Sequence, residues 1–154
     1  MSSDEKKPEA PFRAFGDYRW DEAALLAYKE EGAAPFRAIT RQTLFKNPEL
    51  RCEMRYFEVA AGGYSTLERH EHTHGVMILR GEADVLVGNE VRHVKTHDLV
   101  HIPPMTWHQF RTRGDTPMGF LCMVNAERDR PQLPSEEELN QLIADPTIAA
   151  FLKS

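Results

Sequence analysis

The sequence has no long apolar run, few cysteines and no excess of positive charge, and each absence excludes a class of protein. No stretch approaches the roughly 20 apolar residues that a helix needs to cross a bilayer. With only Cys52 and Cys122, the chain has neither a disulfide framework nor a cysteine-rich zinc site. The formal net charge of −5 disfavours a nucleic-acid-binding surface. The polar first residues lack the apolar core of a signal peptide, so we expect a cytoplasmic protein with reduced thiols and no membrane partner.

What is present is the composition of a globular domain. The chain has 154 residues, of which 41% are hydrophobic and 28% charged, which suffices for one domain with a sizeable core. Residues 1–17 carry prolines and mixed charges with little apolar periodicity, which predicts a flexible arm. We expect a β-rich domain with an N-terminal extension over residues 18–126, and a helical extension over residues 127–154.

The middle of the chain has the pattern of short β-strands separated by turns. Apolar runs end at glycine or proline, and Gly88-Asn89 between two of them indicates a hairpin because both residues tolerate positive φ. The runs are residues 55–60, 64–70, 76–80, 83–87, 90–94, 99–103, 107–112 and 118–124. Short connections imply antiparallel pairing, so the predicted fold class is all-β, an antiparallel β-barrel or sandwich.

Helical patterns are confined to short segments at the two ends of the chain. Residues 21–30 could form a short helical turn. Ser135 and Glu138 have the spacing of a capping box, which predicts the start of a helix. Asp145-Pro146 predicts the start of a second short helix, because proline is favoured at the first helical position.

Imidazole is concentrated in one window of the sequence. The seven histidines are His70, His72, His74, His93, His97, His101 and His108. Glu68 and His70 share a face of an extended strand because side chains alternate along it. His74 begins the next strand and His108 enters from a third, so these side chains can converge inside a barrel on a divalent transition metal. The alternative is an incidental histidine-rich turn that faces solvent.

These residues resemble the two sequence motifs of the cupin superfamily. The first motif usually reads G-x5-H-x-H-x3-4-E-x6-G and is similar to the stretch from Gly63 to Gly81. The second usually reads G-x5-P-x-G-x2-H-x3-N and is similar to the stretch from His97 to Thr112. The resemblance spans about residues 50–125. It implies a small antiparallel barrel, or jelly roll, that holds one divalent transition metal per chain (Fe, Mn, Ni, Cu or Zn).

The sequence departs from the family pattern at several positions. With Gly81 as the anchor, Glu68 stands where the family has its first histidine, and His74 stands where it has glutamate. The resemblance therefore implies a metal site with three imidazoles and one relocated carboxylate, made of Glu68, His70, His74 and His108. His97 and Met105 replace glycines of the second motif, and we expect these changes to alter turns rather than ligands.

Four neighbouring side chains have more than one interpretation. His72 lies in the turn, where we expect it to face solvent or to support the ligands rather than to bind the metal. Cys122 is either a small buried group or a thiol that contributes to the site. Arg55 and Arg80 could bind a substrate carboxylate, although placement at the surface is favoured for both.

The expected function is that of a metal-binding single-domain cupin. The favoured activity is that of a metalloenzyme acting on a small organic substrate, either as a dioxygenase-type oxidoreductase or as an isomerase, with Glu68 as a catalytic base. The alternative is a barrel that binds a small ligand as a sensor or carrier, without turnover. A homodimer is also expected, with residues 36–46 as a candidate exchanged strand.

Overall fold

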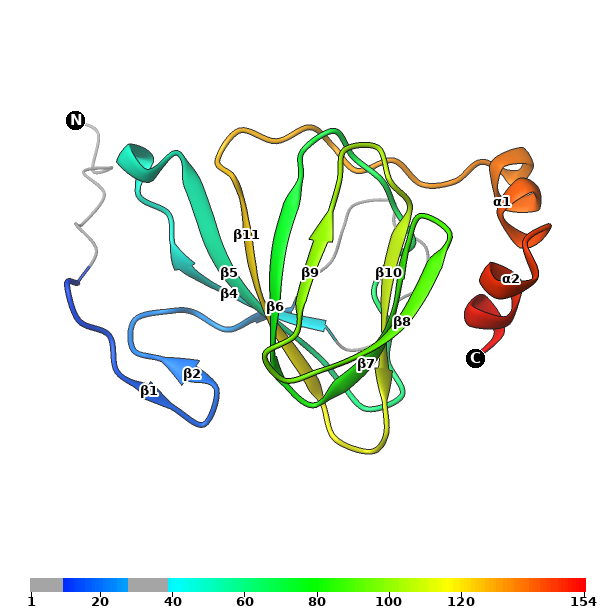
Figure 1. The fold of residues 1–154 in the computed structure, drawn as a ribbon. Coiled ribbons are helices and arrows are strands. Elements are labelled where there is room, and N and C mark those ends of the chain that lie inside the picture. The colour runs from blue at the N-terminus through cyan, green and yellow to red at the C-terminus, as the bar shows by residue number, and fades with distance from the viewer. Residues whose placement is uncertain (1–9, 28–38) are drawn as a thin grey trace.

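The computed structural model describes residues 10–27 and 39–154, and two antiparallel sheets form its centre (Figure 1). The larger sheet has six strands and the smaller has three. The strands are β3 Leu26–Ala27, β4 Ile39–Phe45, β5 Cys52–Val59, β6 His74–Arg80, β7 Glu82–Val87, β8 Glu90–Lys95, β9 Leu99–Ile102, β10 His108–Arg113 and β11 Met118–Asn125. Their order is β3-β4-β5-β11-β6-β9 in the larger sheet and β10-β7-β8 in the smaller.

The all-β, antiparallel prediction is confirmed, and all but one of the predicted runs coincide with a strand. The hairpin at Gly88 joins β7 to β8, with φ of +66° at that glycine. The exception is the run 64–70, which forms isolated antiparallel bridges instead of a continuous ladder. Within the described ranges the two sheets share no continuous ladder, so the barrel is open between them.

Alternate side chains of both sheets meet in one apolar core. Three phenylalanines lie at its centre, with ring centroids 4.6 Å apart for Phe110 and Phe120, and 5.3 Å apart for Phe57 and Phe120. Aliphatic side chains from β5, β6, β7, β9 and β11 complete it, among them Val59, Ile78, Val85, Ile102 and Met118. Since burial of apolar surface is the main driving force of folding, this core holds the two sheets together.

A hairpin near the N-terminus covers the outer face of the larger sheet (Figure 1). Its strands are β1 Phe15–Gly16 and β2 Arg19–Trp20. The rings of Tyr18 and Trp20 lie 6.1 and 5.2 Å from the ring of Tyr56 on β5. The predicted end of the flexible arm, at residue 17, falls inside this hairpin, and the division into arm, barrel and extension stays a prediction.

The expected helical turn over residues 21–30 is wrong for its described part. Residues 21–22 form a turn, and Leu26–Ala27 pair with Thr40 and Arg41 of β4. Pairing with an exposed strand edge outweighs the weak helical preference of this short segment. Residues 28–30 lie outside the described residues.

Both predicted C-terminal helices are confirmed, as α1 Glu136–Ile143 and α2 Pro146–Lys153. The capping box at Ser135 has both of its hydrogen bonds. Ile148 and Phe151 of α2 pack on Leu86 of β7 and cover the outer face of the smaller sheet. A short 3-10 helix, η1 Pro48–Leu50, connects β4 to β5.

No helix within residues 10–27 and 39–154 has the length and apolarity that crossing a membrane requires. Of the candidate exchanged strand, residues 36–38 lie outside the described residues. Residues 39–45 form β4, which pairs with β5 of the same chain. The homodimer stays a prediction.

Gly81 connects β6 of the larger sheet to β7 of the smaller sheet, at a position where the backbone of Pro117 approaches closely. Its φ is +67°, and an added Cβ would lie 2.4 Å from the backbone oxygen of Pro117. Gly81→Ala should therefore lower the free energy of unfolding by about 2–4 kcal/mol in urea titrations. Gly114 is the matched control, because its φ is +83° but nothing lies within 4 Å of the added Cβ. Gly114→Ala should cost only about 1–2 kcal/mol, and equal losses in the two variants would contradict the prediction.

Candidate metal centre

An antiparallel bridge brings Glu68 and His108 face to face. The amide of Glu68 donates to the backbone oxygen of His108 at 3.2 Å, and the amide of His108 donates to that of Glu68 at 3.0 Å. Directly opposed residues of an antiparallel pair project to the same side. As a result, Oε1 of Glu68 lies 3.9 Å from Nε2 of His108.

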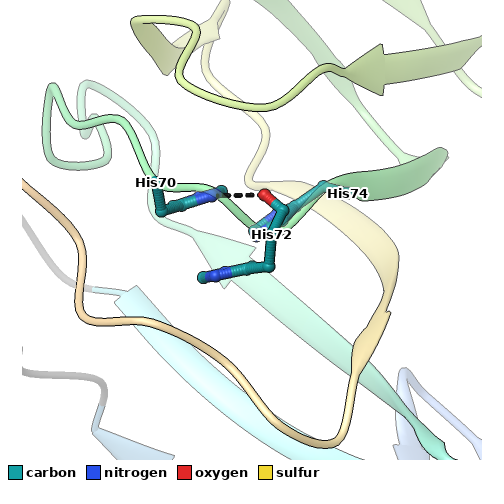
Figure 2. A group of neighbouring side chains, drawn as sticks. All are labelled: His70, His72 and His74. Atoms are coloured by element: carbon teal, nitrogen blue, oxygen red, sulfur yellow. Dashed lines mark hydrogen bonds between the residues drawn. The ribbon is translucent and has the colours of Figure 1, made fainter.

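His70 lies at the centre of a group of four imidazoles, which we call the histidine cluster (His70, His72, His74 and His108). Figure 2 shows three of its members, His70 and His72 from the segment before β6 and His74, the first residue of β6. The ring of His70 is 1% exposed and stacks on His72 at 3.7 Å and on His74 at 4.5 Å between centroids. It meets the ring of His108 edge to face at 4.8 Å. The structure thus brings the three predicted histidine ligands, His70, His74 and His108, together with His72.

Backbone oxygen acceptors determine which nitrogen of two rings carries the proton. Nδ1 of His70 lies 2.6 Å from the backbone oxygen of His72, and Nδ1 of His108 lies 2.9 Å from that of Thr106. A carbonyl oxygen only accepts, so in both rings Nδ1 carries the hydrogen and donates it. The lone pair is then on Nε2, the atom that binds a metal when the other nitrogen is held in this way.

His74 carries the clearest sign of a metal ligand. Its Nδ1 lies 3.2 Å from the sulfur of Cys122, while its Nε2 is buried and has no hydrogen-bond partner. Burial and the neighbouring imidazoles of His70 and His108 hold the pKa of His74 well below its usual value, so the ring is neutral. A buried neutral nitrogen without a partner is costly unless a ligand binds it.

The donor atoms are spaced closely enough for one divalent ion. Those of His70, His72 and His74 lie within 4.8 Å of one another, and so do those of Glu68, His70 and His108. An ion about 2.1 Å from each ligand places its donors within roughly 4.2 Å of one another. Small side-chain movements close this difference, so the residues present fit a metal. The assignment of four ligands within this group stays a prediction.

Of the two positions expected for His72, facing solvent or supporting the ligands, the solvent-facing one is wrong. Its side chain is only 7% exposed, and its Nδ1 lies 2.7 Å from Oδ1 of Asp129. Although desolvation opposes the shift, hydrogen bonds from the amide of Glu71 and from His72 hold the pKa of Asp129 below its usual value. An ionised carboxylate that orients an imidazole is typical of metal ligands and of their immediate supports. Sequence reasoning missed Asp129 because it lies 57 residues from His72 and in no recognisable pattern.

An inner cavity of about 50 Å³ adjoins the histidine cluster. Its lining includes Glu68, His74, His108 and Cys122 as well as the core phenylalanines Phe57, Phe110 and Phe120. An outer pocket of about 200 Å³ shares Glu68, His74 and Arg55 with this cavity. A small organic molecule that enters the outer pocket can therefore reach the cluster.

Of the two arginines named from the sequence, only one lies at this site. Arg80 pairs with Glu58 at 3.0 Å and stacks over Tyr18, away from the cavity. Arg55 is buried, with 6% of its surface exposed, so the expectation of a surface position is wrong for it. Its Nη2 lies 4.0 Å from Sγ of Cys122. Burial raises the pKa of the Cys122 thiol, and the guanidinium of Arg55 opposes that rise.

The sequence of the chain is similar to a family model and to the sequence of a known protein. The family model of the cupin domain matches residues 55–124. The 1-methylthio-D-xylulose 5-phosphate methylsulfurylase of Rhodospirillum rubrum is 59% identical over 145 residues, which are 94% of this chain and 93% of that protein.

Solved structures agree with this result. A cupin-2 domain from Rhodospirillum rubrum has a TM-score of 0.84 and 59% identity, covering 94% of this chain and 97% of that one. A cupin 2 conserved barrel domain protein from Rhodopseudomonas palustris has a TM-score of 0.85 and 55% identity, covering 91% of this chain and 97% of that one. Both similarities extend over nearly the whole chain.

Alanine variants of single histidines test the ligand set. His70→Ala, His74→Ala or His108→Ala should each remove most of the metal from the purified protein, because three remaining ligands hold a divalent ion less tightly. Glu68→Ala should weaken binding less, since an imidazole contributes more to such a site. His72→Ala should leave the content near one ion per chain, and so should His93→Ala, a surface control. Elemental analysis measures each value, and full metal in His74→Ala or none in His72→Ala would overturn the assignment.

Proposed function

The chain belongs to the cupin family, and we propose that it is a metal-dependent enzyme that removes the methylthio group from a 1-methylthio-ketose 5-phosphate. The observation that carries the proposal is the position of Cys122, whose thiol lines the inner cavity 3.2 Å from a histidine of the cluster. A thiol is the side chain suited to accept a sulfur group. The 59% identity to a methylsulfurylase over 94% of the chain supports this substrate class.

The chemistry of this substrate defines what the site must do. Breaking the bond between C1 and sulfur leaves an electron pair on C1, which the neighbouring C2 carbonyl can take up as an enolate. A divalent ion bound by Glu68 and the histidine cluster would supply a Lewis acid for substrate oxygen atoms. The buried, low-polarity wall of phenylalanines excludes water and strengthens the electrostatic interactions in the cavity.

Cys122 is assigned the role of nucleophile. Its thiolate attacks the methylthio sulfur, a sulfur–sulfur bond forms, and the C1–S bond breaks with its electron pair passing to C1. Glu68, on the same cavity, takes the proton that leaves the thiol and returns it to C1. Cys122 is then a methyl disulfide, and a small external thiol reduces it and carries the methylthio group away.

Arg55 and His74 favour the thiolate that this step needs. Both lie beside Sγ, at 4.0 Å for Nη2 of Arg55 and at 3.2 Å for Nδ1 of His74. With Nε2 of His74 facing the other rings of the histidine cluster, its Nδ1 carries the hydrogen and donates it to the sulfur of Cys122. A positive charge and a donated hydrogen bond both stabilise the anionic form of a thiol.

The test is turnover by the purified protein loaded in turn with Mn(II), Fe(II), Ni(II) or Zn(II). The substrate is 1-methylthio-D-xylulose 5-phosphate with a small thiol, and proton NMR follows the loss of the methylthio signal while an electrode follows O2. Release of the methylthio group without O2 uptake supports the proposal. O2 uptake would favour the dioxygenase chemistry, rearrangement without loss of sulfur the isomerase, and binding without turnover the sensor, and each of these would overturn it.

The two cysteines provide a matched pair of variants. Cys122→Ser should lower kcat by at least about a hundredfold, because an alcohol does not accept a methylthio group, while metal content is unchanged. Cys52→Ser should retain wild-type activity, since Cys52 is at the start of β5 and does not line the cavity. Mass spectrometry without added thiol should show one methylthio adduct, on Cys122. An active Cys122→Ser variant would exclude the covalent step.

A further inference from the structure

Arg55 is a buried cation that lacks a buried anion. In the part of the chain that the structure describes, no carboxylate lies within ion-pair distance of its guanidinium, and its Nε is buried without a hydrogen-bond partner. Its contacts are the Cys122 sulfur at 4.0 Å and the face of Phe57 at 4.9 Å. Burial of a guanidinium is unfavourable unless it is paired and hydrogen-bonded. The fold therefore keeps a positive charge at a position where a bound anion would stabilise it.

A second arginine projects to the same side of the sheet. In the β4–β5 ladder Arg55 lies opposite Thr43, and Arg41 lies opposite Phe57. Opposed residues share a face and side chains two positions apart along a strand do so as well, which makes Arg41 and Arg55 diagonal neighbours on the interior face. Both line the outer pocket. Two guanidinium groups thus converge on the opening that leads to the histidine cluster.

The carboxylates of the outer pocket do not pair with Arg55. Asp129 is bound by His72 and by the amide of Glu71, and Glu68 faces His108. The third arginine of the pocket, Arg128, pairs with Glu53 at 3.1 Å. Arg55 therefore remains as a buried positive charge available to a ligand that enters the pocket, and Arg41 lines the same pocket.

We propose that Arg55, together with Arg41, binds the phosphate group of a phosphate monoester in the outer pocket, beside the histidine cluster. The planar fork of a guanidinium matches two oxygens of a phosphate, and two such forks can hold a dianion. The inference rests on the proposed function for the sugar that carries the phosphate. The anion subsite itself rests on the arginines alone.

Calorimetric titration with inorganic phosphate, D-xylulose 5-phosphate and unphosphorylated D-xylulose tests the subsite. Metal-loaded wild-type protein should bind the sugar phosphate at least tenfold more tightly than the free sugar. Arg55→Met should weaken binding of phosphate and of the sugar phosphate at least tenfold, and Arg55→Lys should lie between, because lysine keeps the charge but loses the fork. Arg92→Met, on the exposed face of β8, is the control and should bind like wild type. Arg55→Met binding within twofold of wild type would overturn the proposal.

Melting temperatures separate a binding role from a structural one. If Arg55 exists to bind an anion, Arg55→Met in phosphate-free buffer should melt no lower than wild type, since methionine fills the space without a buried charge. Phosphate should raise the melting temperature of wild type and leave that of the variant unchanged. A lower melting temperature in Arg55→Met with the phosphate shift retained would assign the arginine a structural role instead. If Arg55→Met does not fold, Arg41→Met carries the same comparison.

The subsite and the proposed function can fail separately. Loss of phosphate binding in Arg55→Met, with no turnover of the methylthio substrate by wild type, supports the subsite and overturns the function. Turnover by wild type with a KM in Arg41→Met and Arg55→Met equal to that of wild type supports the function and overturns the subsite.

Discussion

The hydrogen bonds that hold Nδ1 of the clustered histidines determine the character of this site. Backbone oxygens of His72 and Thr106 accept from His70 and His108, and the carboxylate of Asp129 accepts from His72. Because each acceptor is fixed by the backbone or by amide donors, the rings cannot turn without leaving a buried hydrogen unpaired. The lone pairs are therefore held in fixed directions, and binding of an ion would require only small side-chain movements.

The inner walls of the barrel divide into an apolar half and a charged half. Phe57, Phe110 and Phe120 stack in the core and supply apolar burial between the sheets. On the same interior face of β5, Arg55 stands two residues before Phe57 and places a charge where an aliphatic side chain would stabilise the fold more. This pattern, in which stability is given up at one position of an otherwise regular core, is typical of a binding site.

Local patterns predicted most of the fold, because strand alternation, the Gly88 turn and the Ser135 cap each depend on a few neighbouring residues. The proximity of Glu68, His70, His74 and His108 also followed from strand parity and from the family motifs. The predictions that were wrong concern positions whose structure depends on contacts with residues far away in the sequence. The orientation of His72 depends on Asp129, and the segment at residues 26–27 became a strand because the edge of β4 was available. The burial of Arg55 could be predicted from the sequence, because Arg55 alternates with the buried residues Phe57 and Val59 along β5. Its charge favours the opposite prediction, because arginine is usually exposed.

The two lost glycines of the second motif lie in two turns, His97 between β8 and β9 and Met105 between β9 and β10. His97 and Met105 have φ of +75° and +53°, so the backbone keeps the left-handed conformation that glycine would favour. The expectation that these substitutions alter the turns rather than the ligands stays a prediction. Each non-glycine residue in that region costs on the order of 1 kcal/mol. At Met105 a hydrogen bond of 2.7 Å from its amide to the backbone oxygen of His70 offsets part of the cost. The same bond joins the turn that precedes His108 to the segment that carries His70, so local strain is retained where it fixes the separation of two candidate ligands.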